Sequence, residues 1–441
     1  MERTLIKDLA QNIEKGVTIN GWIHIRRDHG KLIFLDIRDS TGLVQGVVLP
    51  NYEKAHKVAE TLRPEWVVTI EGKVNKRPLK MVKEGVQNGD IELEITSITV
   101  LASAEVPFEL DTELNIDTFL DNQPYTLRSE RSRAIFKVQS HIIKAFHAFL
   151  DSRGFTEFQC PKIVGGDAEG GSAVYNIDHF GHKAGLATSP QLYKQIMVGV
   201  FERVYTIGNV FRAEKHATSR HLNEYTSLDL EFGFIKDHTD IMRLENDLMI
   251  AITEELHKTC EKEFALLKAE IPVVPAHIPT MKLREAQELI EKEFGGKAVG
   301  EPDLEPEHER QLCEWAKKTH NSDFIFITHY PITKRPFYTY EDENDKGFSK
   351  SFDLLFRGVE ITTGGQRRHT RELMLEGLKN KNLNPELFSF YLQAFDTGMP
   401  PHGGLAIGLE RLTQKFLNLS NVKEATLFPR DINRIDTLLS K

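Results

Sequence analysis

Five stretches in the N-terminal quarter of the chain alternate apolar and polar side chains, and this pattern constrains the fold more than any other feature. They are residues 18–27, 31–40, 43–49, 66–75 and 90–101. Each has the length and the period of two that are typical of a strand, whereas residues 52–63, between the third and fourth stretches, have helical spacing. Five strands with one helix after the third predict a small closed barrel of the OB type, which we assign to residues 1–102.

The period of two also assigns the side chains of the first two predicted strands to opposite faces. The inward set is apolar: Ile19, Ile23, Ile25, Ile33, Leu35 and Ile37. The outward set is aromatic or charged: Trp22, His24, Arg26, Phe34, Asp36 and Arg38. Aromatic and basic side chains on one face suit single-stranded nucleic acid, although a lone exposed Phe34 could equally lie beneath a loop.

The overall charge separates two modules. The chain of 441 residues has room for two or three domains, and its net charge of −9 excludes a protein that binds nucleic acid merely by being basic. Residues 1–105 carry 15 Lys+Arg and 15 Asp+Glu; subtracted from the totals of 56 and 65, these leave 41 and 50. The acidic excess therefore belongs to the C-terminal part.

No targeting or membrane segment is recognisable. The stretch from Met1 to Gln11 lacks the basic start and apolar core of a signal peptide, and no apolar run approaches the roughly 20 residues that span a bilayer. The cysteines are odd in number and far apart, without the spacing of zinc ligands: Cys160, Cys260 and Cys313. We predict a cytoplasmic protein with reduced thiols and no membrane association.

A second domain of residues 129–441 follows a hinge. Residues 103–128 lack periodicity and contain two prolines, whereas a helix begins at Arg131, stops at Gly154 and leads into a strand over 155–163. Further strands are predicted at residues 203–213, 224–235, 352–363 and 403–408. Further helices are predicted at residues 239–262 and 281–320, the second within a helical insertion of roughly residues 265–325. This pattern predicts an α+β fold with a mostly antiparallel sheet.

The segment from Phe211 to Phe232, FRAEKHATSRHLNEYTSLDLEF, concentrates charge around a strand–loop–strand turn. Residues 212–221 contain six charged or histidine side chains: Arg212, Glu214, Lys215, His216, Arg220 and His221. Arginine suits a polyanion because its planar guanidinium contacts phosphate oxygens in pairs and stays charged at any working pH. A solvated hairpin tip is the alternative interpretation of these charges.

A second segment makes the interpretation specific. GGLAIGLERLTQKFL, from Gly403 to Leu417, passes from a glycine-rich strand into a helix that opens with Glu410 and Arg411. FRAE with RHLNE resembles the second signature of class II aminoacyl-tRNA synthetases, and GLERL resembles the third. The helix and strand that end near Pro161 resemble the weak first signature. No phosphate-loop motif, Rossmann fingerprint, HIGH or KMSKS sequence competes with this resemblance.

Within class II, the chain resembles the aspartyl-tRNA synthetases of archaeal type. The motifs that carry this resemblance are SPQLYKQ at residues 189–195, FDLLFRGVEITTGGQR at 352–367 and GMPPHGG at 398–404. It extends from GWIHIRRDHGKLIFLDIRD at residues 21–39 to LFPRD at 427–431. The resemblance implies ATP and magnesium dependence, tRNA and L-aspartate as partners, and a homodimer built on residues 129–163.

The resemblance also implies roles around ATP. Arg212 would bind the α-phosphate and the substrate carboxylate, and Glu214 would recognise adenine. Tyr225 and Arg411 would stack on the two sides of the purine, although some relatives lack an aromatic residue at the first position. Two residues would bind the γ-phosphate: Arg220 and His221. The implied ATP site is Arg212, Ala213, Glu214, Arg220, His221, Leu222, Tyr225, Glu360, Gly408, Leu409, Glu410 and Arg411. The implied catalytic residues are Arg212, Glu360 and Arg411.

Asp353 and Glu360 are the implied magnesium ligands, with the Thr363 hydroxyl near the metal. Hard carboxylates suit an ion that bridges phosphates. Seven residues apart on one flat strand, the two acids would lie on opposite faces, so we predict a turn at Arg357–Gly358 that brings them together. A surface ion pair with nearby arginines is the alternative.

Lys194 and Arg367 resemble the pair that binds the side-chain carboxylate of aspartate. Asparagine would leave two buried cations unpaired, which is costly, so we predict selection of aspartate. The related asparaginyl enzymes do not keep the lysine of SPQLYK. The implied aspartate site is Glu169, Gln191, Leu192, Tyr193, Lys194, Arg212, Thr363 and Arg367.

In the barrel, the resemblance makes Phe34 a stacking partner of the central anticodon uridine, with Arg27 and Gln45 hydrogen-bonded to nearby bases. Among archaeal-type enzymes, Trp at the position of His24 tends to accompany strict use of aspartate tRNA. Histidine there tends to accompany charging of asparagine tRNA as well. His24 therefore predicts a broader choice of tRNA.

The predicted reaction has two steps: aspartate attacks ATP to give aspartyl-adenylate and pyrophosphate, and a terminal ribose hydroxyl of tRNA then takes the aspartyl group. Three other functions share part of the pattern. An ammonia-dependent asparagine synthetase would lack the barrel, and a non-catalytic RNA-binding paralogue would be expected to lose Arg212, Glu360 or Arg411. An asparaginyl-tRNA synthetase would not keep Lys194.

Overall fold

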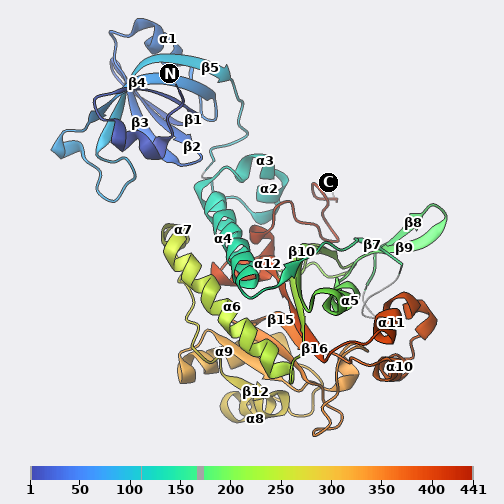
Figure 1. Ribbon diagram of the computed structural model, residues 1–441. Coiled ribbons are helices and arrows are strands. Elements are labelled where there is room, and N and C mark those ends of the chain that lie inside the picture. Colours follow the sequence, from blue (N-terminus) through green and yellow to red (C-terminus); the bar gives the residue numbers. More distant parts are fainter. Residues whose placement is uncertain (1, 111, 166–172, 440–441) are drawn as a thin grey trace. The chain divides into compact units, whose positions relative to one another are not determined.

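A computed structural model describes residues 2–110, 112–165 and 173–439. The chain forms two compact units, Met1–Thr112 and Glu113–Lys441 (Figure 1). Among the described residues, no helix is long and apolar enough to cross a membrane.

The first unit is a closed five-stranded barrel with the strand order β1-β2-β3-β5-β4. Its elements are η1 (Ile6–Asn12), β1 (Gly16–His29), β2 (Leu32–Asp39), β3 (Gly42–Val48), α1 (Glu53–Thr61), β4 (Val67–Lys76), η2 (Leu79–Met81) and β5 (Ile91–Ala102). Isoleucine, leucine and valine side chains from all five strands fill the interior together with Leu62 and two alanines of α1. The predicted OB-type barrel, with one helix after the third strand, is confirmed.

The predicted faces of β1 are wrong beyond Ile23, because the pairing of β1 with β2 shifts between Ile23 and Ile25. This β-bulge at His24 reverses the alternation of the residues that follow. Ile25 is consequently 40% exposed rather than inward. Arg27, not Arg26, now lies opposite Phe34 on the neighbouring strand.

The charged residues of β2 are also less exposed than predicted. Asp36 and Arg38 are both buried, and each has a partner of opposite charge. Arg27 donates to the two carboxylate oxygens of Asp36 at 2.8 and 2.9 Å, and Arg38 donates to Glu65 at 2.8 Å. Phe34 is half-buried. The pairing, not solvent, therefore compensates the charges on this face.

The second unit is built on an eight-stranded, mostly antiparallel sheet with the order β12-β13-β14-β15-β16-β11-β10-β6. Its strands are β6 (Thr156–Glu157), β10 (Arg203–Phe211), β11 (Glu224–Gly233), β12 (Thr280–Lys282), β13 (Phe324–Thr328), β14 (Ser351–Phe356), β15 (Val359–Gln366) and β16 (His402–Gly408). A three-stranded sheet contains β7 (Ile163–Val164), β8 (Asn176–His179) and β9 (His182–Leu186). The helices are α2 (Ile116–Asp121), α3 (Gln123–Thr126), α4 (Glu130–Ser152), α5 (Gln191–Phe201), α6 (His238–Thr259), α7 (Glu261–Leu267), α8 (Leu283–Phe294), α9 (Pro306–His320), α10 (Arg371–Asn380), α11 (Ser389–Asp396) and α12 (Leu409–Phe416).

Alternation along β11 explains how the large sheet separates a core face from a polar face. Leu228, Leu230 and Phe232 belong to the main apolar core, to which α4 and α6 contribute on one side of the sheet (Figure 1). Ser227 and Asp229, on the intervening positions, project from the opposite face. The polar face of β11, β15 and β16 is where the candidate site lies.

Helices α8 and α9, in the segment predicted as an insertion, cover the sheet at β13 and β14, on the same face as the candidate site. Leu283 and Ile290 of α8 and Leu312 of α9 pack with Ile325 and Leu355 of the sheet. The first turn of α9 thereby approaches the β14–β15 hairpin.

Two local predictions differ from the structure. Residues 103–128 are not an irregular hinge throughout, since they contain α2 and α3. The strand predicted over 155–163 is reduced to β6 and the start of β7, because Pro161 cannot donate a ladder hydrogen bond. Residues 352–363 form two strands on either side of the turn predicted at Arg357–Gly358.

Candidate active site

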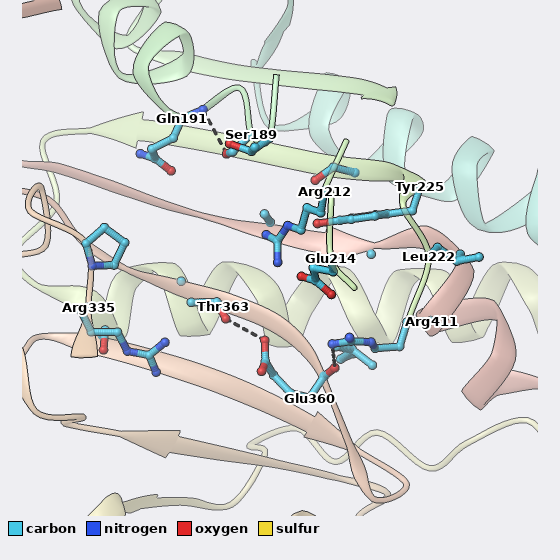
Figure 2. Close-up of a pocket in the computed structure, with 18 of the residues that line it drawn as sticks. Ser189, Gln191, Arg212, Glu214, Leu222, Tyr225, Arg335, Glu360, Thr363 and Arg411 are labelled. Carbon is cyan, nitrogen blue, oxygen red and sulfur yellow. Dashed lines mark hydrogen bonds between the residues drawn. The ribbon is translucent and has the colours of Figure 1, made fainter. Parts of the chain in front are cut away.

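A cavity of about 450 Å³ opens on the polar face of β11, β15 and β16. The structure brings most of the predicted site residues together there, from segments far apart in sequence. Those that line it are Gln191, Lys194, Arg212, Glu214, Arg220, His221, Leu222, Tyr225, Glu360, Thr363, Arg367, Gly408, Glu410 and Arg411. Figure 2 shows Arg212 beside Tyr225, and Arg411 beside Glu360.

Several predicted residues do not line the cavity. The side chains of Leu192, Tyr193 and Leu409 pack in apolar clusters instead. Neither Ala213 nor Asp353 contributes to the lining, and Glu169 lies outside the described residues.

The cavity also has a basic edge that the sequence analysis missed. Lys334, Arg335 and Tyr338 line it from the segment after β13. The basic pair in TKRPFY was the only available signal, and it belongs to no motif or period.

The lining is predominantly cationic. Its lysines and arginines are Lys194, Arg212, Arg220, Lys334, Arg335, Arg367 and Arg411, against three acids, Glu214, Glu360 and Glu410. A concave surface with such an excess of positive charge attracts a polyanion. Burial lowers the pKa of His221 below its usual range, and the charge of Glu214 opposes this shift.

Hydrogen bonds within the loop between β10 and β11, and from β11 to α12, fix the conformation of this loop. The Asn223 side-chain amide donates to the carbonyl oxygens of Arg212 at 2.6 Å and Glu214 at 3.0 Å. The guanidinium of Arg212 lies over the Tyr225 ring, 5.6 Å from its centroid. Both carboxylate oxygens of Glu410 accept from the Thr226 N–H at 3.0 Å, which ties α12 to β11. These contacts fix the loop that carries Arg212 at the cavity.

Glu360 and Thr363 face the cavity together because of a β-bulge. The pairing of β14 with β15 shifts between Leu354 and Leu355, so residues three apart share a side. Thr363 Oγ1 donates to Glu360 Oε1 at 2.8 Å (Figure 2). The turn lies at Arg357–Gly358, as predicted, and both of its residues have positive φ.

Asp353 is 4% exposed and lies behind this edge of the cavity. Arg335 donates to its Oδ2 at 2.7 Å, and its Oδ1 has no hydrogen-bond partner among the described residues. Burial raises the pKa of Asp353 to about 6; Arg335 opposes this effect and the charge of Glu360 adds to it.

A buried carboxylate oxygen without a partner, near a second carboxylate, fits a hard cation such as Mg²⁺. This ion typically takes one or two carboxylates and completes its shell with water and phosphate. Within the described ranges, no group of three or more His, Cys, Asp or Glu side chains could hold a metal. The ion would therefore depend on ligands from a bound nucleotide.

The premise that Lys194 and Arg367 are unpaired cations is wrong. Lys194 Nζ donates to Asp229 Oδ1 and to the Leu405 carbonyl, both at 2.9 Å, and lies 3.5 Å from Glu231 Oε2. Arg367 donates to Glu231 at 2.9 and 3.3 Å. All four side chains are nearly fully buried. The two cations and two anions balance, so charge alone does not make this corner positive.

The second candidate site lies in the barrel, where a cavity of about 520 Å³ is lined by Arg27, His29, Phe34, Gln45, Arg77, Pro78, Met81, Lys83 and Glu92. The rings of His29 and Phe34 meet edge-to-face with centroids 5.6 Å apart. Gln45 Nε2 donates to Glu92 at 2.9 Å, which orients the amide. His24 is not part of this lining. The predicted anticodon residues Arg27, Phe34 and Gln45 thus share one hollow.

Comparison with known proteins identifies the family of each unit. Residues 115–432 match the family of class II tRNA synthetases (D, K and N), and residues 17–101 match the family of OB-fold nucleic acid binding domains. The chain is 46% identical over 444 residues to the aspartate–tRNA(Asp/Asn) ligase of Deinococcus radiodurans, covering 99% of each. It is also 46% identical to the Thermus thermophilus protein of that name, covering 98% of this chain and 99% of the relative.

Among solved structures, asparaginyl-tRNA synthetase from Pyrococcus horikoshii complexed with asparaginyl-adenylate superposes with a TM-score of 0.91. The two share 29% identity, and 99% of each chain is covered. An asparagine enzyme therefore shares the fold of this chain. The chain belongs to the class II tRNA synthetases of the D, K and N group and, within that group, to the aspartate–tRNA ligases.

Proposed function

We propose that this ligase activates L-aspartate with ATP and transfers it to the tRNAs for both aspartate and asparagine. The observation that carries the proposal is the buried Lys194–Asp229 and Arg367–Glu231 network at the end of a cationic cavity. Residues 129–441 would form the catalytic domain, with a dimer through residues 129–163, and residues 1–102 would bind the anticodon.

Selection of aspartate follows from hydrogen-bond polarity rather than from net charge. The carboxylates of Asp229 and Glu231 accept hydrogen bonds from Lys194 and Arg367 on the side away from the cavity. Toward the cavity, Lys194 and Arg367 present N–H donors. The aspartate side chain offers only acceptors, whereas the asparagine amide must direct its NH₂ group toward these donors. A buried donor facing a donor is costly, so asparagine would be rejected.

The chain's own residues would then carry adenylation by positioning and charge. Arg212 would bind the aspartate α-carboxylate and the α-phosphate and stabilise the charge that grows on phosphorus. The carboxylate oxygen forms a bond to the α-phosphorus as the bond to pyrophosphate breaks. Glu214 would recognise adenine, and Tyr225 and Arg411 would flank the ring.

Glu360, Thr363 and the free oxygen of Asp353 would hold Mg²⁺. When bound, the ion supplies positive charge that neutralises the phosphate oxygens and orients the leaving group. Arg335 donates to Oδ2 of Asp353, which leaves Oδ1 of that side chain without a partner among the described residues.

The choice of tRNA would depend on the barrel. Phe34 would stack on an anticodon base, and Arg27 and Gln45, held by Asp36 and Glu92, would donate to neighbouring bases. The two relatives at 46% identity bear names that include both tRNAs. His24, the bulge residue of β1, supports the same breadth.

The test is to charge purified aspartate tRNA and asparagine tRNA with labelled aspartate, with labelled asparagine as the control. We expect both tRNAs to accept aspartate and neither to accept asparagine. The variant His24→Trp should lose charging of asparagine tRNA while its charging of aspartate tRNA serves as the internal control. Charging of aspartate tRNA alone by the unmodified enzyme would refute the proposed breadth.

A further inference from the structure

One contact at the edge of the cavity joins a motif residue to a helix that lies outside every motif. Arg220, which lines the cavity, directs its guanidinium to α9: Nη1 donates to Glu309 Oε2 at 3.3 Å, and Nη2 donates to the Gly358 carbonyl at 3.4 Å. The two charged side chains are 25% and 14% exposed. Glu309 belongs to the helical segment for which the sequence indicates no role.

The two hydrogen bonds of this contact are long, which indicates a weak interaction. Charge-assisted hydrogen bonds between arginine and carboxylate are typically about 2.7–2.9 Å long and often paired. Arg220 makes one bond to each of two acceptors, and both bonds are longer. A phosphate group that offers a bidentate contact would therefore replace these partners at little cost.

The surroundings add electrostatic competition. Burial and the nearby charge of Glu360 raise the pKa of Glu309 to about 7, and the charges of Arg220 and Arg411 oppose this shift. A phosphate bound by Arg220 would come close to two carboxylates, one of which, Glu309, coordinates nothing that the proposed reaction needs. Negative charges held near a bound anion in a partly buried site weaken its binding.

We infer that Glu309 is a positioning residue that holds Arg220 in the empty enzyme and competes with the terminal phosphates of ATP and with pyrophosphate for its guanidinium. The inference rests on the proposed binding of ATP. Its consequence is a moderated phosphate affinity, which favours release of pyrophosphate once adenylate has formed.

The decisive variant is Glu309→Gln, which keeps the shape of the side chain and removes its charge. We expect the KM for ATP and the inhibition constant of pyrophosphate to fall roughly 1.5- to 5-fold, the range of a partly exposed ion pair. The KM for aspartate should not change. Calorimetric titration with pyrophosphate in the presence of EDTA should show the same gain in affinity without turnover.

Three controls separate competition from a merely structural role. Glu314→Gln, exposed on the same helix, should leave every constant unchanged. Glu309→Asp retains the charge and should not tighten pyrophosphate binding. In an Arg220→Gln background, Glu309→Gln should have no further effect on pyrophosphate binding.

The outcomes distinguish the two proposals. Absence of aspartate-dependent ATP–pyrophosphate exchange by the unmodified enzyme would refute the proposed function. An active enzyme whose Glu309→Gln variant shows an unchanged or raised KM for ATP would overturn the role of Glu309 alone. Equal tightening by Glu309→Asp would likewise overturn it, because the charge would then not be the cause.

Discussion

Replacing Glu231 by Gln tests the balanced charge cluster at the end of the cavity. Glu231 is 0% exposed, and its carboxylate accepts two hydrogen bonds from Arg367 and lies 3.5 Å from Lys194 Nζ. Among the described residues, the variant leaves the two buried cations with Asp229 as their one remaining anionic partner. Removing one partner of a buried ion pair costs about 3–5 kcal/mol.

We expect the lower end of this range for the catalytic unit, because glutamine keeps one carbonyl oxygen for Arg367. A loss of about 3 kcal/mol corresponds to a fall of roughly 4 °C in the thermal midpoint of a unit of this length. The measurement is urea and thermal unfolding followed by circular dichroism. Glu254→Gln, exposed on α6, is the matched control. A loss below about 1 kcal/mol would refute the description of the cluster as charge-balanced.

The same variant makes a prediction about pH. Burial raises the pKa of Glu231, but Arg367 and Lys194 outweigh this effect and hold it below its usual value. A depressed carboxyl pKa contributes stability above the pKa of the unfolded chain, about 4.3, and that contribution is lost as pH falls through the lower folded pKa. The stability difference between the native enzyme and Glu231→Gln should therefore be constant near pH 7 and shrink below about pH 4. A constant difference down to pH 3 would contradict the assignment.

Three further predictions address the other parts of the enzyme. Arg212→Lys should lower aspartate-dependent ATP–pyrophosphate exchange about 100-fold or more, because lysine cannot reproduce the bidentate contact; retention of activity would exclude Arg212 as the residue that stabilises the developing charge. Phe34→Ala should weaken tRNA binding by roughly 1–3 kcal/mol in a filter-binding assay while leaving ATP–pyrophosphate exchange unchanged; an equal loss in both assays would indicate a fold defect. Phe356→Ala should destabilise the catalytic unit by about 3–5 kcal/mol in urea unfolding, because its ring stacks on Phe324 with centroids 4.2 Å apart and also meets Phe416, whereas exposed Phe390→Ala should have little effect.

Local pattern carried much of the fold. The five alternating stretches, the helix after the third and the strand–loop–strand of residues 203–235 are short-range features, because burial on one face imposes its period directly on the sequence. The resemblance to class II synthetases rested on ordered motifs, and most of their residues line one cavity. The roles assigned to them remain predictions.

Features that depend on distant partners were not readable in this way. The bulge at His24 reversed the faces of β1, because one extra residue is invisible to a period-two pattern. In the sequence, Lys194 and Arg367 looked like unpaired cations. Their partners Asp229 and Glu231 lie on a different segment, where they appear only as the polar positions of an alternating strand.

The sequence by itself determined the barrel strands, the main strands and helices of the second unit and the family that they build, since these follow from side-chain period and motif order. Only the tertiary structure decided how the charges are compensated: that Arg335 takes one oxygen of Asp353, and that Glu309 of α9 contacts Arg220. The physical reason is that an electrostatic partner is chosen by distance in space, which the sequence separation of two charged residues does not encode.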